Sequence, residues 1–190
     1  AIVASVEDSL RRLGREQIDL IQLHTSVALA RRPERQWLGP ADFDAAMAAF
    51  SRLQAQGKVR HWGFTGTGET AALHQAIAGN VHTVQCPYNL LNPTAGTQAP
   101  PGFPFQDFGR LIDRAAEHNV GVIAIRILAG GALSGSTARH PNAMQQVDPI
   151  GTSKTLADDA ALAGRFGFLV DEGHAASLVE AAIRFAMSKK

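Results

Sequence analysis

The sequence predicts an α/β protein built on a parallel sheet. Along its 190 residues, short apolar segments alternate with amphipathic helical segments, an order typical of βαβ units. The apolar segments are nearly continuous runs of Val, Ile and Leu, as expected when helices cover both faces of a sheet. Links from helix to strand are short and several links from strand to helix are long, which places functional residues at the carboxyl ends of the strands.

The first half of the chain divides into clear strands and helices. Val6, Leu10 and Leu13 recur at helical spacing between Ser5 and Gly14, and glycine is a typical helix stop. The predicted elements are a helix over residues 5–14, strands over 18–23, 59–65 and 81–86, and helices over 41–57 and 69–80.

The second half has longer connections. A loop rich in Pro and Gly leads to a helix and an apolar strand, and a glycine-rich tract then precedes helical sequence. No linker or low-complexity segment divides the chain, so we expect one domain over residues 1–190. The predicted elements are a loop over 87–104, a helix over 105–119, a strand over 120–128, a glycine-rich tract over 129–153 and helical sequence from 156 onward, interrupted around 167–173.

Composition and charge exclude several functional classes. The formal net charge is +1 and no basic patch is present, so neither nucleic acid nor an anionic membrane is an expected partner. No apolar run has the length of a membrane span, and no basic-then-apolar leader opens the chain. The single cysteine, Cys86, excludes an intramolecular disulfide, so we expect a cytoplasmic protein in which Cys86 is an inert core thiol.

The stretch IDLIQLHTS, residues 18–26, ends an apolar strand on His24. A histidine there can either face a substrate or fill a structural position by bonding a nearby carbonyl, and the residues alone leave both interpretations open. The chain contains no HExxH sequence, no Cys/His cluster and no GxSxG sequence. We therefore predict no metal site and no serine nucleophile.

Two glycine-rich segments follow strands. GTGETA, residues 66–71, matches the GxGxxG/A dinucleotide pattern, but no acidic residue stands between Glu69 and Asp107 to bind the ribose, so a tight turn is the favoured interpretation. LAGGALSG, residues 128–135, is either a loop whose N–H groups approach a phosphate or a flexible connection. A parallel α/β enzyme with a phosphate ligand is therefore one functional alternative.

Four segments, in this order and spacing, resemble the aldo-keto reductases: SLRRLGREQIDLIQLH, LQAQGKVRHWGFTGTG, VQCPYNLLN and GVIAIRILAGGALSG. Members of this family are (β/α)8 barrels that transfer a hydride between NAD(P)H and a carbonyl or alcohol. The resemblance implies an incomplete TIM barrel whose strands correspond to about the fourth to the seventh. It also implies a small-molecule carbonyl or alcohol substrate and NADP or NAD as cofactor, with NADP favoured by the resemblance alone.

The resemblance implies roles for residues in the first half of the chain. His24 corresponds to the active-site histidine, which hydrogen-bonds the substrate carbonyl. Thr65 and Gly66 stand where the family usually has Ser-Asn, and with Gln85 they would hold the nicotinamide carboxamide, although Gly66 supplies no side-chain amide. The loop after His24 is expected to rim the pocket, where Trp37 either faces a substrate or packs the loop down.

The second half carries the remaining cofactor residues that the resemblance implies. Ile125 falls where a tyrosine often stacks on the nicotinamide, so an apolar contact is expected in its place. Arg126, Leu128 and Gly130 match the loop that lies along the pyrophosphate. Arg126 would either pair with a phosphate or remain a solvated cation.

Two departures from the family pattern affect the functional prediction. The catalytic aspartate, tyrosine and lysine of the family match no residue here, and a complete barrel needs about 250 residues, so the chain is expected to be a fragment whose own activity is in question. A non-catalytic interaction or regulatory protein on the same scaffold is therefore the alternative. Four strands do not close a barrel, and self-association through open sheet edges is also expected.

Overall fold

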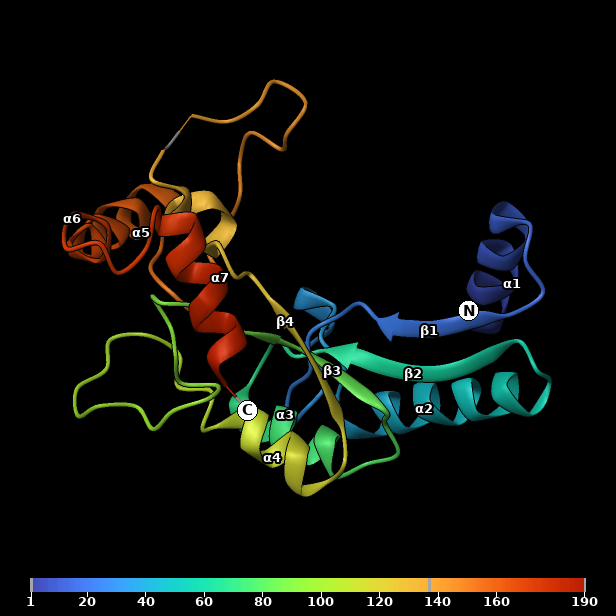
Figure 1. Ribbon diagram of the computed structural model, residues 1–190. Coiled ribbons are helices and arrows are strands. Elements are labelled where there is room, and N and C mark those ends of the chain that lie inside the picture. The colour runs from blue at the N-terminus through green and yellow to red at the C-terminus, as the bar shows by residue number, and fades with distance from the viewer. Residues whose placement is uncertain (1, 137, 190) are drawn as a thin grey trace. The chain divides into compact units, whose positions relative to one another are not determined.

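In the described part of the chain, four strands form one sheet. A computed structural model describes residues 2–136 and 138–189 (Figure 1). The strands lie in the order β1-β2-β3-β4, and β1 pairs in parallel with β2, as β2 does with β3. The predicted α/β class with a parallel sheet in sequence order is confirmed. The bounds are Ile18–Leu23 for β1, Val59–Thr65 for β2, Thr83–Pro87 for β3 and Gly121–Ile125 for β4.

Helices and short 3-10 turns connect the strands. The helices α2, α3 and α4 each lie between two consecutive strands in the chain. No helix in the described part of the chain is long and apolar enough to cross a membrane. The elements are α1 (Ile2–Leu13), η1 (Pro33–Arg35), α2 (Pro40–Ala55), α3 (Thr70–Ile77), α4 (Leu111–Glu117), η2 (Ala129–Ser134), α5 (Leu156–Ala163), η3 (Gly164–Phe166), α6 (Phe168–Asp171) and α7 (Leu178–Ser188).

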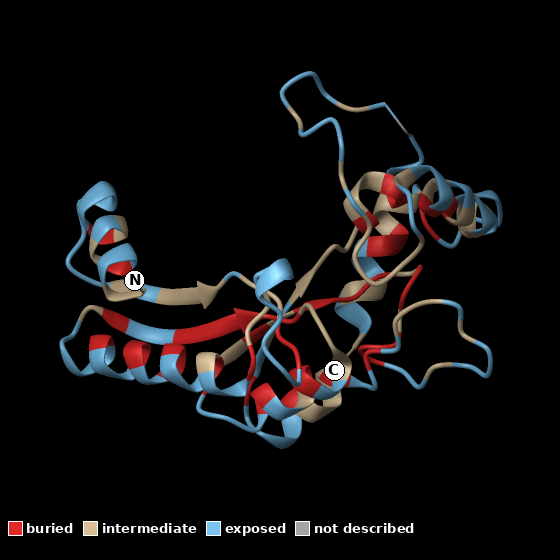
Figure 2. Ribbon diagram, turned by 180° about the vertical axis from the view of Figure 1, so that it is seen from behind, coloured by how far each residue is buried: buried red, intermediate tan, exposed pale blue. Residues whose placement is uncertain are grey.

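The helix α2 illustrates how the local sequence determines an element. Pro40 lies in its first turn, where a missing N–H costs little and the fixed φ suits a helix. Phe43, Met47 and Phe50 recur every three or four residues and are buried, which gives the helix one apolar face. Figure 2 shows this buried face turned toward β2. Gly57, with φ of 72°, stops the helical segment in the left-handed region.

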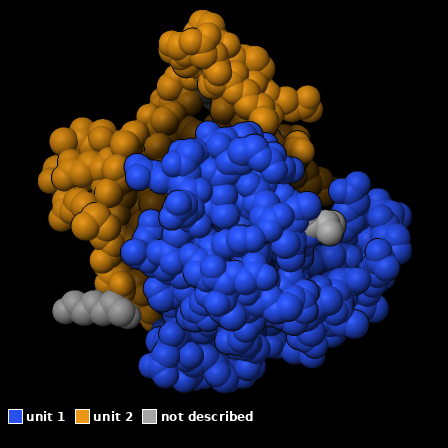
Figure 3. All heavy atoms as spheres, turned by 90° about the vertical axis from the view of Figure 1, so that its right-hand side faces the viewer, with its two compact units in different colours: residues 1–86, 111–123 blue, residues 87–110, 124–190 orange. Residues whose placement is uncertain are grey.

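The chain divides into two compact units, which Figure 3 colours separately. Unit 1 comprises residues 1–86 and 111–123, and its core includes the buried rings of Trp62 and Phe64 from β2. Unit 2 comprises residues 87–110 and 124–190. The single domain over residues 1–190 remains a prediction. The core cluster of unit 2 contains Leu91, Ala129, Ala132, Leu133, Ala163 and Ala182.

The predicted helix over residues 105–119 is wrong in its first part. The helix α4 begins only at Leu111. Before it, the N–H of Phe108 donates to the Thr94 hydroxyl at 3.0 Å instead of entering a helical ladder. Gly109 and Arg110 then have φ of 60° and 58°, and a right-handed helix does not continue through two left-handed residues.

Other boundaries also differ from the predictions. The strand β3 begins two residues later than expected, at Thr83, and β4 ends at Ile125 because Arg126 turns the backbone to φ of 57°. The interruption predicted around residues 167–173 contains the short helix α6. The helical sequence instead breaks after Asp171, near Gly173, whose φ is 75°.

Candidate functional site

Three predicted site residues meet at the carboxyl ends of neighbouring strands in unit 1. Leu23 is paired with Phe64, so His24, the next residue, lies level with Thr65. Thr65 is in turn paired with Gln85 on β3. We expect His24, Thr65, Gln85 and Arg126 to share one end of the sheet, and the register confirms this for the first three. This is the end at which parallel α/β folds place their functional groups.

The His24 side chain reaches solvent and carries no structural hydrogen bond. The residue is exposed, and among residues 2–136 and 138–189 no hydrogen-bond partner is found for its ring. A histidine that filled a structural position would bond a nearby carbonyl. The geometry therefore favours a side chain that is available to a ligand, because both ring nitrogens remain unused.

Thr65 and Gln85 form a hydrogen-bonded pair beside His24. The Thr65 hydroxyl donates to Gln85 Oε1 at 2.9 Å, and Thr65 is only 7% exposed. In the described residues Gln85 Nε2 has no acceptor. The pair can thus offer an N–H donor to an external carbonyl, while the threonine oxygen can still accept. This donor and acceptor set fits a carboxamide.

Gly66 completes this edge through its backbone alone. Its N–H donates to the Gln85 carbonyl oxygen at 2.6 Å. A Cβ at Gly66 would lie 2.5 Å from that same oxygen, closer than real Cβ atoms approach, and 3.2 Å from Val84 Cγ2, which is a tight contact. The close contact between β2 and β3 therefore requires glycine here, and the position can accept no amide-bearing side chain in this geometry.

A second glutamine–threonine pair lies one layer deeper in the sheet and connects β1 with β3. Gln22 Nε2 donates to the Thr83 hydroxyl at 2.7 Å, and the two side chains meet over Gly63, where a Cβ would lie 2.1 Å from that hydroxyl. The buried Gln22 Oε1 has no hydrogen-bond partner in the described structure. Sequence reasoning missed this pair, because only the strand register shows that Gln22 and Gly63 face each other.

The GTGETA segment forms a tight turn against the loop after β1. Gly68 has φ of 117°, and a Cβ there would lie 2.0 Å from the Val27 carbonyl oxygen. The Val27 N–H donates to the Thr67 carbonyl, and the Glu69 N–H donates to the Val27 carbonyl. Glycine is thus required by the close approach of two backbones, which agrees with the favoured turn interpretation.

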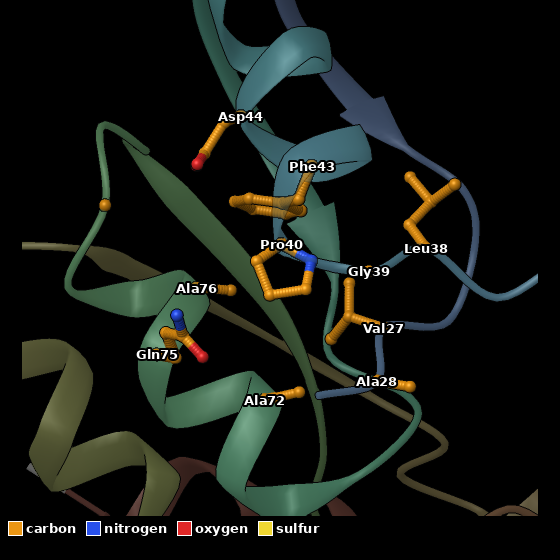
Figure 4. Close-up of a pocket in the computed structure, with 11 residues that line it drawn as sticks. Val27, Ala28, Leu38, Gly39, Pro40, Phe43, Asp44, Ala72, Gln75 and Ala76 are labelled. Atoms are coloured by element: carbon orange, nitrogen blue, oxygen red, sulfur yellow. The ribbon is translucent and has the colours of Figure 1, made fainter. Parts of the chain in front are cut away.

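Trp37 lies in the connection between β1 and α2. Its half-buried ring packs against two cations of its own loop, with the guanidinium carbons of Arg32 and Arg35 at 5.9 and 5.2 Å from the ring centroid. A pocket with an empty volume of about 350 Å³ lies between this connection, α2 and α3 (Figure 4). None of the predicted site residues lines it, so it is not the candidate active site.

The predicted pyrophosphate loop belongs to unit 2. Arg126 follows β4 with a left-handed backbone, and its Nη1 donates to the Asp148 carbonyl at 3.3 Å. Gly130 has φ of 70°, and its carbonyl accepts from Arg139 Nη1 at 3.0 Å. Neither arginine has a carboxylate partner in the described part of the chain. The loop therefore holds two cations near one glycine turn, and sequence reasoning missed Arg139.

The two apolar residues predicted to contact the cofactor, Ile125 and Leu128, flank the same loop. Ile125 is the last residue of β4 and is half-buried. The Ile125 carbonyl accepts the N–H of Tyr88 at 3.2 Å. Leu128 packs against the core cluster of unit 2, so its side chain contributes to folding while its backbone leads into the glycines.

Two other reactive residue types have structural roles. Burial raises the pKa of the Cys86 thiol to about 12, so the thiol stays protonated and unreactive, as expected. Tyr88 is the one tyrosine of the chain and is 2% exposed. Its ring lies 4.8 Å from that of Phe185.

In the described residues no group of three or more metal-ligating side chains is found.

Comparison with known proteins defines the class of this chain. A family model described as the aldo/keto reductase family matches residues 1–190. A methylglyoxal reductase from Escherichia coli is 34% identical over 89 residues, which is 46% of this chain and 26% of that protein. The chain therefore belongs to the aldo/keto reductase family.

Solved structures agree with this assignment at the level of the fold. A glycerol dehydrogenase from Gluconobacter oxydans has a TM-score of 0.63 and 23% identity, over 99% of this chain and 51% of that one. An aldo-keto reductase from Bacillus halodurans has a TM-score of 0.60 and 22% identity, over 99% and 53%. An aldo/keto reductase from Klebsiella pneumoniae in complex with NADP and acetate has a TM-score of 0.50 and 24% identity, over 70% and 39%. This chain spans about half the length of the first two.

Proposed function

We propose that this chain carries the carbonyl-orienting and nicotinamide-binding residues of an NAD(P)H-dependent oxidoreductase. The reaction is transfer of a hydride between nicotinamide and a small carbonyl or alcohol substrate. The observation that carries the proposal is the carboxyl edge of β1, β2 and β3, where His24 stands beside the Thr65–Gln85 pair. Membership of the family supports it, as does the NADP complex of the Klebsiella pneumoniae relative.

His24 would act on the substrate oxygen. A bound nicotinamide would supply the hydride, and negative charge would then develop on the oxygen of the carbonyl. An imidazole N–H directed at that oxygen stabilises the charge and fixes the orientation of the carbonyl. The unused ring nitrogens of His24 leave it able to make this bond without breaking one inside the protein.

Thr65 and Gln85 would hold the nicotinamide carboxamide. Gln85 Nε2 is the donor for the carboxamide oxygen, and the Thr65 oxygen is an acceptor for the carboxamide NH2. Gly66 contributes no side chain, so it acts by allowing β2 and β3 to approach closely. In unit 2, Arg126 and the backbone at Leu128 and Gly130 would lie along the pyrophosphate, and Ile125 would supply an apolar contact. NADP is favoured over NAD on the family resemblance alone.

A group that donates a proton to the substrate oxygen would distinguish the catalytic proposal from a non-catalytic role on the same scaffold. Tyr88 is unsuited to donate a proton to a substrate because it is buried against Phe185. The family's acid–base residues have no counterpart in this chain, which is the reason for keeping the non-catalytic alternative. Cofactor binding and turnover therefore have to be measured separately.

The test compares His24→Gln with His118→Gln in the purified full-length parent protein, because residues 1–190 alone, without the acid–base residues, are expected to show no turnover. His118 is exposed and follows α4, so its substitution controls for the loss of a histidine as such. Removing a donor to a developing oxyanion costs about 10²- to 10³-fold in rate, and we expect that loss of carbonyl-dependent NADPH oxidation for His24→Gln only. Equal activity of the two variants would make His24 dispensable. Cofactor binding without any turnover would instead support the non-catalytic alternative.

A further inference from the structure

The connection between β1 and α2 is fastened to the turn that follows β2. Beyond the two backbone hydrogen bonds at Val27, the hydroxyls of Ser26 and Thr67 lie 2.9 Å apart. Val27 forms isolated parallel bridges with both Leu38 and Gly68. Both segments belong to unit 1. These contacts hold the first residues of the connection, and the rest of the connection extends from there.

The Glu69 carboxylate adds two further contacts to the same connection, beyond Val27. Its Oε2 accepts the N–H of Leu29 at 2.8 Å, and its Oε1 accepts a hydrogen bond from the Arg32 guanidinium. The N–H of Leu29 and the charge of Arg32 lower the pKa of Glu69 below its ordinary value of 4.5. The carboxylate is therefore ionised at neutral pH and binds two groups of a segment that lies about 40 residues earlier in the chain.

Arg32 connects this carboxylate to Trp37. The two residues form an antiparallel bridge, in which each N–H donates to the other's carbonyl oxygen at 3.1 Å. The Arg32 guanidinium also lies over the Trp37 ring, at 5.9 Å from its centroid. One side chain thus contacts the Glu69 carboxylate and the tryptophan ring at once, and it links the two groups.

We propose that Glu69 is a positioning residue that sets the placement of Trp37 and thereby the size of the carbonyl substrates that the site accepts. The inference rests on the proposed function. The connection that carries Trp37 leaves the same strand end as His24. In this proposal the indole, held through the charged Arg32–Glu69 contact, would narrow the entrance by a fixed amount, whereas a released connection would admit larger substrates and orient small ones poorly.

The first test measures the connection directly and needs no catalysis. Glu69→Gln keeps an acceptor for the Leu29 N–H and removes the charge that binds Arg32, and Glu69→Ala removes both. Glu34→Gln is the matched control, because Glu34 lies exposed in the same connection and has no partner within the described ranges. Arg32→Ala reaches the same contact from the other side if a Glu69 variant fails to fold.

Amide hydrogen exchange reports the outcome. We expect exchange of the Leu29 amide to become about tenfold faster in Glu69→Ala and less affected in Glu69→Gln, with unchanged protection in α2. Unchanged exchange in both variants and in Arg32→Ala would overturn the proposal. Equally faster exchange of the Leu29 amide in Glu34→Gln would also overturn the proposal, since removal of any charge from the connection would then be enough to loosen it.

The second test separates positioning from a general structural role. With a bulky and a small carbonyl substrate, Glu69→Gln should change the ratio of the two kcat/KM values by about tenfold and leave NADPH affinity unchanged. A uniform loss for both substrates would overturn the specificity role. Absence of carbonyl reduction by the unaltered protein would remove the proposed function, and the exchange experiment would still decide whether Glu69 positions the connection.

Discussion

Replacement of Gln85 by leucine is the sharpest test of the proposed nicotinamide site. Leucine keeps most of the side-chain volume and removes the amide. Two interactions are lost: the acceptor for the Thr65 hydroxyl, which lies at 2.9 Å, and the Nε2 donor that the described residues leave unused. The first loss affects the stability of the folded protein, and the second affects the cofactor.

The size of each effect follows from the burial of the groups. Leaving a desolvated carboxamide oxygen without its donor costs about 1–3 kcal/mol. Because 1.4 kcal/mol is a factor of ten in a dissociation constant, NADPH should bind about 5- to 150-fold more weakly. Thr65 is 7% exposed, so the loss of its acceptor should cost about 1 kcal/mol of the free energy of unfolding.

The assay is a fluorescence titration of NADPH against the unaltered protein, Gln85→Leu and Gln22→Leu. Gln22 is a matched control because it also bonds a threonine hydroxyl on β3, at 2.7 Å, one layer deeper in the sheet. Gln22→Leu should change the unfolding free energy and leave the dissociation constant unaltered. Equal affinities for the unaltered protein and Gln85→Leu would refute the site, as would equal weakening in the two variants.

Four further predictions concern folding and assembly. Gly66→Ala should lower the unfolding free energy by about 1–3 kcal/mol in urea, since its Cβ would meet the Gln85 carbonyl at 2.5 Å; no change would show that β2 and β3 can separate. Asn92→Ala should cost about 3 kcal/mol, because buried Thr94 donates its hydroxyl to Asn92 at 2.7 Å and its N–H at 3.1 Å, and a loss below about 1 kcal/mol would contradict this. With its pKa raised to about 12, Cys86 should be alkylated only on unfolding, so rapid labelling of the folded protein would count against its burial. Light scattering should detect self-association through the outer edges of β1 and β4, and a monodisperse monomer would exclude it.

The sequence by itself determined the elements whose signals are local. The apolar spacing in α2 and the glycine after it specify a helix without reference to any other segment, and the continuous apolar runs specify parallel strands. His24 could be selected because it ends such a run. These predictions succeed because hydrophobic periodicity and backbone stops act within a few residues.

Tertiary structure alone decided the contacts between segments that are distant in the chain. The hydroxyl of Thr94 accepts a hydrogen bond from the N–H of Phe108. This contact helps to exclude the residues before Leu111 from the helix that their local pattern favours. Nothing in the sequence around Glu69 indicates a contact with another segment, and its contacts with Leu29 and Arg32 exist only because two loops are brought together by their strands. The same register sets Thr65 opposite Gln85, and no local pattern encodes it, because pairing partners are chosen by the packing of the whole sheet.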